Sequence, residues 1–239
     1  MTDSVSYECN DRVATIRIDD GKRNALSPSV LDQIYAAFDR AESDRAVVIL
    51  TGREDVFSAG FDLNVMKKGG GAAIGMLKRG YGLPARILNY PYPVIAACNG
   101  HSLAMGVFMM LAADYTIGSR GDYKIAANEV AIGMTMPRVA AAMLEHRLQP
   151  AAYQRAITVS NFFDPESAKD AGFFDALVEP AALMDHAGAI ATLCQSLDEH
   201  AHKVSKRRIR KRLVRRIRRQ RWLDLWDAGM VGLRRARKS

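Results

Sequence analysis

The segment PVIAACNGHSLAMG, residues 93–106, passes from one secondary-structure pattern to another. Val94–Cys98 is a continuous apolar run, which is typical of a strand buried on both faces of a sheet. The pair Asn99-Gly100 favours a turn, and the small residues after it lead into an apolar stretch that predicts a helix over residues 105–113. The segment therefore predicts a buried strand that continues through a tight turn into a buried helix.

Strands and helices also alternate on the N-terminal side of this segment. Apolar and polar side chains alternate over residues 5–9 and Val13–Ile18 on either side of Asn10-Asp11, which predicts a β-hairpin. Ser27 followed by Pro28 predicts a helix start. The helix would extend to about residue 41 and bury Val30, Ile34 and Phe38. Further strands are predicted over residues 47–50 and 115–117, and a further helix over residues 74–88.

The last part of the chain carries mainly helix signals. From Pro137 onward the sequence predicts mostly helices, and Pro150, Pro165 and Pro180 each stand where a new helix could begin. Strands that alternate with helices, followed by helices alone, predict an α/β core with a helical C-terminal region.

Composition restricts the class of protein. Of the 239 residues, 49% are hydrophobic and 25% are charged, which is typical of globular proteins and excludes disordered and collagen-like chains. Cys9, Cys98 and Cys194 show no CxxC spacing, so neither a disulfide framework nor a zinc knuckle is expected. The N-terminus lacks the pattern of a secretory signal, and the most apolar stretch, residues 103–113, is shorter than the roughly 20 residues that span a bilayer. We therefore expect a cytoplasmic protein.

Charge is distributed unevenly along the chain. Residues 200–239 contain 16 Lys and Arg and 2 Asp and Glu, a net charge of +14, so residues 1–199, with 18 and 24, carry −6. Residues 206–221 contain 11 basic side chains, and Ile209, Leu213 and Ile217 recur among them at every fourth position. Because that spacing gives a helix an apolar stripe, we expect the tail to be a docked helix.

Three segments contain groups that could take part in catalysis. FSAGFDL, residues 57–63, and NGHSLAMG, residues 99–106, each follow a predicted strand and can end in a helix start, where backbone N–H groups lack partners. Two such groups that converge form an oxyanion hole, which stabilises negative charge on a carbonyl oxygen. NEVAIGM, residues 128–134, places one carboxylate, Glu129, before an apolar stretch that would raise its pKa and suit it to proton transfer. On spacing alone, a solvated helix-cap carboxylate explains Glu129 equally well.

Together with KRNALS at residues 22–27 and AADYTIG at residues 112–118, these segments resemble the enoyl-CoA hydratase/isomerase (crotonase) superfamily. The resemblance implies a crotonase (ClpP-like) spiral of ββα units over residues 1–195. It also implies a basic helical region over residues 196–239 that serves oligomerisation and the CoA groove. Trimers or hexamers, an acyl-CoA thioester substrate, and an oxyanion hole formed by the backbone N–H groups of Phe61 and Met105 are further implications. CoA would enter as part of the substrate, and no other cofactor is implied.

Acidic residues distinguish the reactions within this family. Hydratases of the family use two glutamates, because one group must activate the water and another must manage the proton. Here Phe108 occupies the first position, whereas Glu129 retains the second in an Asn-Glu pair similar to that of Δ3,Δ2-enoyl-CoA isomerases. Since moving a double bond requires only one base, we expect isomerisation through Glu129. An enoyl-CoA hydratase is the alternative, and a catalytically weak acyl-CoA-binding or RNA-binding relative is an alternative of another class.

The same resemblance assigns substrate contacts near these segments. Lys22 and Arg23 match the region that lines the CoA groove, although a solvated pair explains them nearly as well. Met105 stands where most members carry Gly and could narrow the acyl pocket, and Phe108 would make one wall apolar. Asp62 is better explained as a helix cap. The predicted substrate-binding residues are Lys22, Arg23, Ala25, Ala59, Gly60, Asp62, Leu63 and Phe108.

For three other features, a purely structural explanation competes with a functional one. Residues 69–71 could form a mobile lid over the acyl pocket or a plain surface loop. His101 is expected to be structural, and no carboxylate or Cys is spaced to complete a metal site with His186, His200 and His202.

The basic helix has three possible functions. Docking with CoA contact ranks first, and nucleic-acid binding is a distant second. Membrane-surface association, which Trp222 and Trp226 favour, is third.

Overall fold

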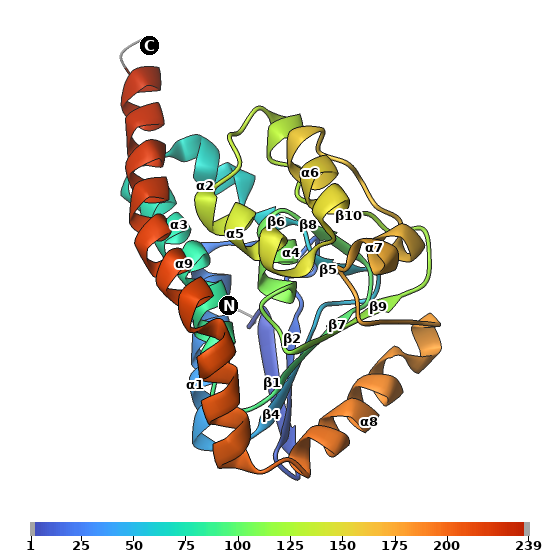
Figure 1. Cartoon of the computed structure of the whole chain (residues 1–239). Helices are drawn as coiled ribbons and strands as arrows, with labels where there is room; N and C mark the ends of the chain where they lie inside the picture. Colours follow the sequence, from blue (N-terminus) through green and yellow to red (C-terminus); the bar gives the residue numbers. More distant parts are fainter. Residues whose placement is uncertain (1–2, 237–239) are drawn as a thin grey trace.

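A six-stranded sheet runs through the protein in the order β1-β2-β4-β7-β9-β11, and helices lie on both of its faces (Figure 1). The computed structural model describes residues 3–236, so residues 237–239 of the predicted basic region lie outside it. β1 and β2 pair antiparallel, whereas the later pairings in this sheet are parallel. The strands are Val5–Asn10 (β1), Val13–Ile18 (β2), Val47–Thr51 (β4), Val94–Cys98 (β7), Tyr115–Ser119 (β9) and Ala176–Val178 (β11).

The predicted hairpin is confirmed, but its turn lies one residue later than predicted. Asn10 pairs with Val13, so Asp11 and Arg12 form the loop, and Asn10 is the last residue of β1. Asp11 and Arg12 have positive φ angles of 48° and 60°, which give a two-residue turn the twist that matches the flanking strands.

Strands of the large sheet alternate with short strands of a second layer and with helices. β4 is followed by β5 (Val56–Ser58) and β6 (Gly60–Phe61), β7 by β8 (His101–Leu103), and β9 by β10 (Ile125–Ala126). The short strands form a parallel sheet in the order β10-β8-β5, and β6 pairs with β3 (Ala25–Leu26). This repetition confirms the expected spiral of ββα units. Because the short strands run parallel, the turns after them lie at the same edge of the second layer.

Helices bury both faces of the large sheet. α1 (Pro28–Ser43) and α3 (Gly70–Leu88) cover one face, and α8 (Leu183–Gln195) packs on the other face against β4 and β7. α1 begins as predicted, since the Ser27 hydroxyl accepts a hydrogen bond from Val30 N at 3.2 Å. β4 and β7 are buried along their whole length, which explains their continuous apolar sequences.

Two helices in the middle of the chain differ in length from the prediction. α2 (Leu63–Lys68) ends at Gly69, whose φ of 67° allows the chain to leave one helix and enter α3 directly at Gly70. The segment expected to be a lid or a loop is therefore a helix junction. α4 (Met105–Met110) ends earlier than predicted, and residues 111–113 form a buried turn before Asp114.

The C-terminal region is mainly helical, as predicted. α6 (Pro150–Thr158) and α7 (Pro165–Ala171) begin at the predicted prolines, and Pro180 begins a short 3-10 helix before α8; α5 spans Arg138–Arg147. The prediction of helices alone was wrong at β11, because three half-buried residues are too few to show a strand period. Within residues 3–236, no helix is both long enough and apolar enough to cross a bilayer.

α9 (Glu199–Ala236) runs along one side of the molecule and packs against α3 and α5 (Figure 1). The predicted docked helix is confirmed, but the predicted apolar face was wrong at its N-terminal end, near Ile209. Ile217 is fully buried, whereas Ile209 is 76% exposed. Each four-residue step overshoots a full helical turn by about 40°, so Ile209 and Ile217 lie about 80° apart around the helix. Among residues 199–230, the buried residues of α9 are Lys206, Arg210, Val214, Ile217 and Asp224.

A buried carboxylate holds the first half of α9. Lys206 Nζ donates to Asp114 Oδ2 at 2.6 Å and to the Tyr92 carbonyl at 3.0 Å. Arg210 Nη1 lies 2.9 Å from Asp114 Oδ1 without a well-aligned hydrogen bond, so this contact is ionic. Burial lowers the pKa of Lys206 to about 8, although the Asp114 charge opposes that shift. Asp114 therefore compensates two buried cations.

A second buried carboxylate holds the other half of α9 and caps α5. Asp224 accepts hydrogen bonds from the backbone N–H groups of Arg138 at 3.0 Å and Val139 at 2.9 Å, and from Arg138 Nη1 at 3.2 Å. Pro137, which precedes α5, has no side chain that could do so. A residue distant in sequence thus supplies the capping carboxylate that the N-terminus of a helix favours.

Candidate functional site

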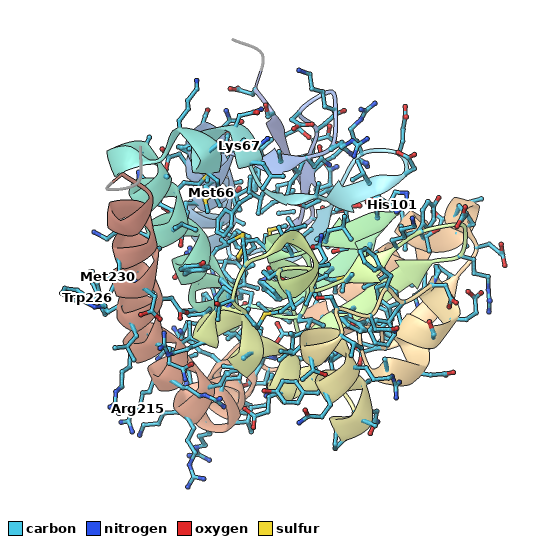
Figure 2. The ribbon with its side chains drawn as sticks, turned by 90° about the horizontal axis from the view of Figure 1, so that it is seen from above. Met66, Lys67, His101, Arg215, Trp226 and Met230 are labelled. Carbon is cyan, nitrogen blue, oxygen red and sulfur yellow. The ribbon has the colours of Figure 1, made fainter. Side chains whose placement is uncertain are left out.

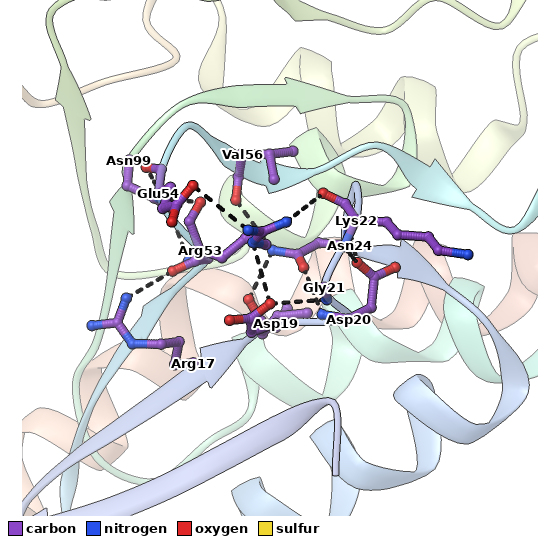
Figure 3. Close-up of polar contacts among 12 residues, drawn as sticks. Arg17, Asp19, Asp20, Gly21, Lys22, Asn24, Arg53, Glu54, Val56 and Asn99 are labelled. Carbon is purple, nitrogen blue, oxygen red and sulfur yellow. Dashed lines mark hydrogen bonds and ion pairs between the residues drawn. The ribbon is translucent and has the colours of Figure 1, made fainter. Parts of the chain in front are cut away.

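A buried asparagine fixes the first of the three predicted segments. Asn24 Nδ2 donates to the carbonyls of Ile18 at 2.7 Å, Val56 at 3.1 Å and Phe57 at 3.2 Å. Its Oδ1 accepts from Asp20 N, and Arg53 Nη1 donates to the Lys22 carbonyl beside it (Figure 3). The end of β2 is thereby joined to β5, which leads into the FSAGFDL segment.

Asn99 organises the neighbouring turn. Its Nδ2 donates to the carbonyls of Arg53 and Glu54, both at 2.6 Å, and its Oδ1 accepts from Gly52 N at 3.0 Å (Figure 3). Both ends of the loop between β4 and β5 are therefore held by polar side chains from separate parts of the chain. Sequence reasoning treated Asn24 and Asn99 as motif or turn residues and missed their positioning roles, because the contacts are long-range.

The FSAGFDL and NGHSLAMG segments meet at Gly60. A Cβ placed on Gly60 would lie 2.9 Å from Ala104 Cβ and 3.3 Å from Met105 N. Gly60 has a φ of 85°, and Ala104, which precedes α4, has a φ of 49°. An alanine in this backbone region is strained, and strained residues are frequent at functional sites. The two predicted helix starts therefore come within contact distance of each other.

The two predicted backbone donors stand at the ends of these segments. Met105 is the first residue of α4, so no helical carbonyl precedes it to accept its N–H, and the Ala104 side chain cannot cap it. Phe61, next to Gly60, is the last residue of β6, and the chain turns at Asp62 into α2. Asp62 is the N-cap of α2, as its preferred explanation predicts, and accepts from Asn64 N at 2.8 Å.

Glu129 follows β10, the strand whose last residue is bonded to Ala104. β10 pairs with β8, and Ala104 N donates to the carbonyl of Ala126, three residues before Glu129, at 2.8 Å. The Glu129 side chain is buried, with 5% exposure, and its Oε2 forms no hydrogen bond among the described residues. Burial raises the pKa of Glu129 from 4.5 to about 7, and a hydrogen bond from its own backbone N–H opposes this shift. The carboxyl group can therefore accept or release a proton near neutral pH.

Tyr81 of α3 links the two sides of the site. Its ring packs edge-to-face on the Phe61 ring at 5.7 Å between centroids. Burial raises the pKa of Tyr81, and the nearby charges of Asp224 and Glu129 raise it further, so its hydroxyl stays protonated. Sequence reasoning missed Tyr81, and the available signal was its place one helical turn after the buried Leu77.

The other predicted residues fall into two groups. Ala25 pairs with Gly60, Ala59 N donates to the Arg23 carbonyl at 3.0 Å, and Phe108 is buried one turn into α4 with 1% exposure. The side chains of Lys22, Arg23 and Leu63 are exposed, and the two cationic groups form no hydrogen bond or ion pair with any described residue. Contacts between separate segments therefore hold the backbone around Gly60, whereas the Lys22 and Arg23 side chains are exposed, and their predicted contact with CoA stays a prediction.

The histidines do not add chemistry to this site. His101 Nδ1 accepts from Lys124 N at 2.9 Å, and its ring packs against Tyr123, so it holds a turn near the surface (Figure 2). In the described part of the chain, no three His, Cys, Asp or Glu side chains are grouped so as to hold a metal ion. Two backbone donors and one buried carboxylate suit proton transfer next to a carbonyl whose oxygen gains negative charge.

Replacing Gly60 with Ala is expected to destabilise the protein by about 1–3 kcal/mol, because the added Cβ meets Ala104 and the φ angle is unfavourable. Urea unfolding of the variant and the original chain measures the difference. Gly75→Ala is the matched control, since Gly75 lies in α3 with open space around its Cβ position, and it should be neutral or slightly stabilising. Equal stability of the two variants would contradict the close approach at Gly60.

Comparisons with known proteins agree with the fold. The model of the enoyl-CoA hydratase/isomerase family matches residues 8–225. A crystal structure of an enoyl-CoA hydratase/isomerase family protein from Pseudomonas syringae is 41% identical, with a TM-score of 0.91 over 93% of this chain and 97% of that chain. The probable enoyl-CoA hydratase echA17 of Mycobacterium avium is 32% identical over 187 residues, which are 77% of this chain and 72% of the relative. The crystal structure of human mitochondrial Δ3-Δ2-enoyl-CoA isomerase is 28% identical, with a TM-score of 0.89 over 95% of this chain and 90% of that chain.

Proposed function

Because this chain belongs to the enoyl-CoA hydratase/isomerase family, we propose that it isomerises 3-enoyl-CoA thioesters to 2-enoyl-CoA thioesters with Glu129 as the only proton-transferring side chain. Similar proteins are named both hydratases and isomerases, so the proposal depends on the residues of this chain. The observation that carries it is a buried carboxyl group whose Oε2 has no hydrogen-bond partner among the described residues, in a site where the position of the first hydratase glutamate holds the buried Phe108.

Among the described residues, no charged side chain contributes to the pKa shift of Glu129, and the two nearest candidates for a second base are unsuitable. Asp224 is the other carboxylate whose charge reaches Tyr81, and it is engaged with the N-terminus of α5. The pKa of Tyr81 is raised by burial, so this phenol remains protonated near neutral pH and is a poor base. Hydration requires one group that activates water and another that delivers a proton. Asp224 and Tyr81 do not supply the second of these groups, so hydration is disfavoured.

In the proposed reaction, the N–H groups of Met105 and Phe61 donate to the thioester oxygen. Glu129 takes the proton from the α carbon, and the electron pair of the broken C–H bond is delocalised onto that oxygen as an enolate. The same carboxyl group then returns the proton to the γ carbon, which leaves the double bond between the α and β carbons. No water enters, so substrate and product have the same mass.

The test is to incubate the purified protein separately with a 3-enoyl-CoA and a 2-enoyl-CoA and to identify the products by chromatography and mass. The expected result is conversion of the former to its 2-enoyl isomer without added mass, and loss of this conversion in Glu129→Gln. Addition of water to the 2-enoyl ester would show a hydratase instead. Binding of both esters without turnover would show a protein that only binds acyl-CoA.

The pH dependence of the reaction provides a separate prediction. Since Glu129 acts in its ionised form and its pKa is raised to about 7, kcat/KM should rise about tenfold per pH unit below neutrality and level off above it. Initial rates across this range at low substrate concentration measure the profile. A profile that is already flat from pH 5 upward would show that the limiting base has an ordinary carboxyl pKa, and Glu129 would not be that base.

A further inference from the structure

The outward face of α9 carries an ordered set of cationic and aromatic side chains. Six exposed residues recur at steps of three or four positions and share one side of the helix, within about 80° of arc. We call them the outer stripe: Arg212, Arg215, Arg219, Trp222, Trp226 and Met230. Figure 2 shows Arg215 and Trp226 on the side of α9 that faces away from the body.

The outer stripe is not used by the fold. α9 docks through its opposite face, where Lys206 and Arg210 meet Asp114 and where Asp224 caps α5. In the part of the chain that the structure describes, Arg212, Arg215 and Arg219 take part in no ion pair, whereas Arg216 pairs with Glu145. α9 is 38 residues long, or about 57 Å, so the stripe is presented on a rigid rod fixed along its inner face.

The aromatic part of the stripe is exposed to an unusual degree. Trp226 is 71% exposed and Trp222 is 56% exposed, and Met230 continues the apolar part beyond them. Tryptophan side chains of soluble proteins are mostly buried, and a cluster of exposed ones marks a surface that another phase or molecule covers. Lys78 Nζ and the Arg221 guanidinium lie 5.6 Å and 5.1 Å from the Trp222 ring, so cations surround the aromatic residues as well.

We propose that the outer stripe docks the protein onto anionic phospholipid surfaces. Arginines that project from a helix bind lipid phosphates, and tryptophan favours the boundary between headgroups and hydrocarbon. Charge complementarity supports this occupant in a second way, because residues 1–199 carry a net charge of −6 and residues 200–239 carry +14. An anionic surface therefore attracts the α9 side of the molecule and repels the body.

Nucleic acid fits the stripe less well. Phosphate groups would neutralise Arg212, Arg215 and Arg219, and a base can stack on Trp226, but Met230 lies on the same line and needs an apolar neighbour. A bilayer interface supplies both kinds of contact along one helix.

The test uses the tryptophans themselves, because Trp222 and Trp226 are the two tryptophans of the chain. Tryptophan emission is recorded while the full chain is titrated with vesicles of phosphatidylcholine alone or of phosphatidylcholine mixed with phosphatidylglycerol. The expected result is a blue shift with the anionic vesicles that the neutral vesicles do not cause. Quenching by brominated lipid should accompany the shift, because both rings enter the interface.

A charge variant and a matched control separate the stripe from general electrostatics. Arg212→Gln/Arg215→Gln/Arg219→Gln should weaken partitioning into anionic vesicles on the order of 10²-fold. Lys124→Gln/Arg155→Gln/Lys169→Gln removes the same charge from exposed positions of the body and should leave partitioning nearly unchanged. All six side chains are exposed, so both variants should fold, which circular dichroism checks.

Three results would overturn the proposal. The first is equal partitioning of the two triple variants, which would show that net charge alone acts. The second is a blue shift that follows protein concentration without lipid, which would show that a second copy covers the stripe. The third is a shift caused by an RNA oligonucleotide but not by anionic vesicles, which would assign the face to nucleic acid.

Discussion

Replacing Glu129 with Gln is expected to lower kcat/KM for a 3-enoyl-CoA on the order of 10²–10⁴-fold, which is the usual contribution of a positioned general base. Gln preserves the volume of the buried side chain but cannot accept the α proton. Substrate binding should remain near its original strength, since the thioester oxygen is held by backbone donors at Phe61 and Met105. Steady-state kinetics and calorimetric binding of the product measure the two effects.

The same substitution should increase stability at alkaline pH, which a purely structural role of Glu129 would not do. The pKa of Glu129 rises from 4.5 to about 7 on folding, so the folded state holds this proton more tightly than the unfolded state. As the pH rises through this window, ionisation of Glu129 removes stability, on the order of 3 kcal/mol in total. Gln does not ionise and avoids this cost.

Urea unfolding of the original protein and Glu129→Gln at about pH 4 and about pH 8.5 tests that expectation. The two proteins should be nearly equal in stability at the lower pH, where both side chains are neutral. At the higher pH the variant should be the more stable. A variant that is less stable at both pH values would show that Glu129 is a structural carboxylate.

Replacing Asp114 with Asn should have the largest effect on stability, a loss of about 3–5 kcal/mol, because two buried cations lose their carboxylate. The pKa of Lys206 is already lowered to about 8 by burial, so Lys206 can lose its proton. Arg210 cannot, and it stays charged in a buried position. Thermal and urea unfolding measure the loss.

Asp32→Asn is the matched control for this prediction. Asp32 pairs with Arg79 at the surface, where both side chains are about half exposed, so its removal should cost less than about 1 kcal/mol. Similar losses for both variants would show that Asp114 does not hold α9 to the body.

Local sequence predicted the elements that depend on neighbouring residues. Ser27 and Pro28 specify the start of α1, the alternation over residues 5–18 specifies a hairpin, and uninterrupted apolar runs specify β4 and β7. The sequence did not predict short elements such as β11, because hydrogen bonds to a neighbouring strand stabilise them. The position of the hairpin turn at Asp11 and Arg12 was not predicted either, because it depends on the register of the two strands.

The sequence by itself determined that this protein has an alternating α/β core, a basic C-terminal helix, and one carboxylate next to two segments that can offer backbone donors. Only the tertiary structure decided that the segments of Gly60 and Ala104 approach closely, that Glu129 is buried with its Oε2 unpaired among the described residues, and that Asp224 caps α5. It also decided which face of α9 is docked and which is open to solvent. Secondary structure follows from short-range periodicity, whereas desolvation, pKa and the approach of two turns arise from contacts between residues far apart in the chain.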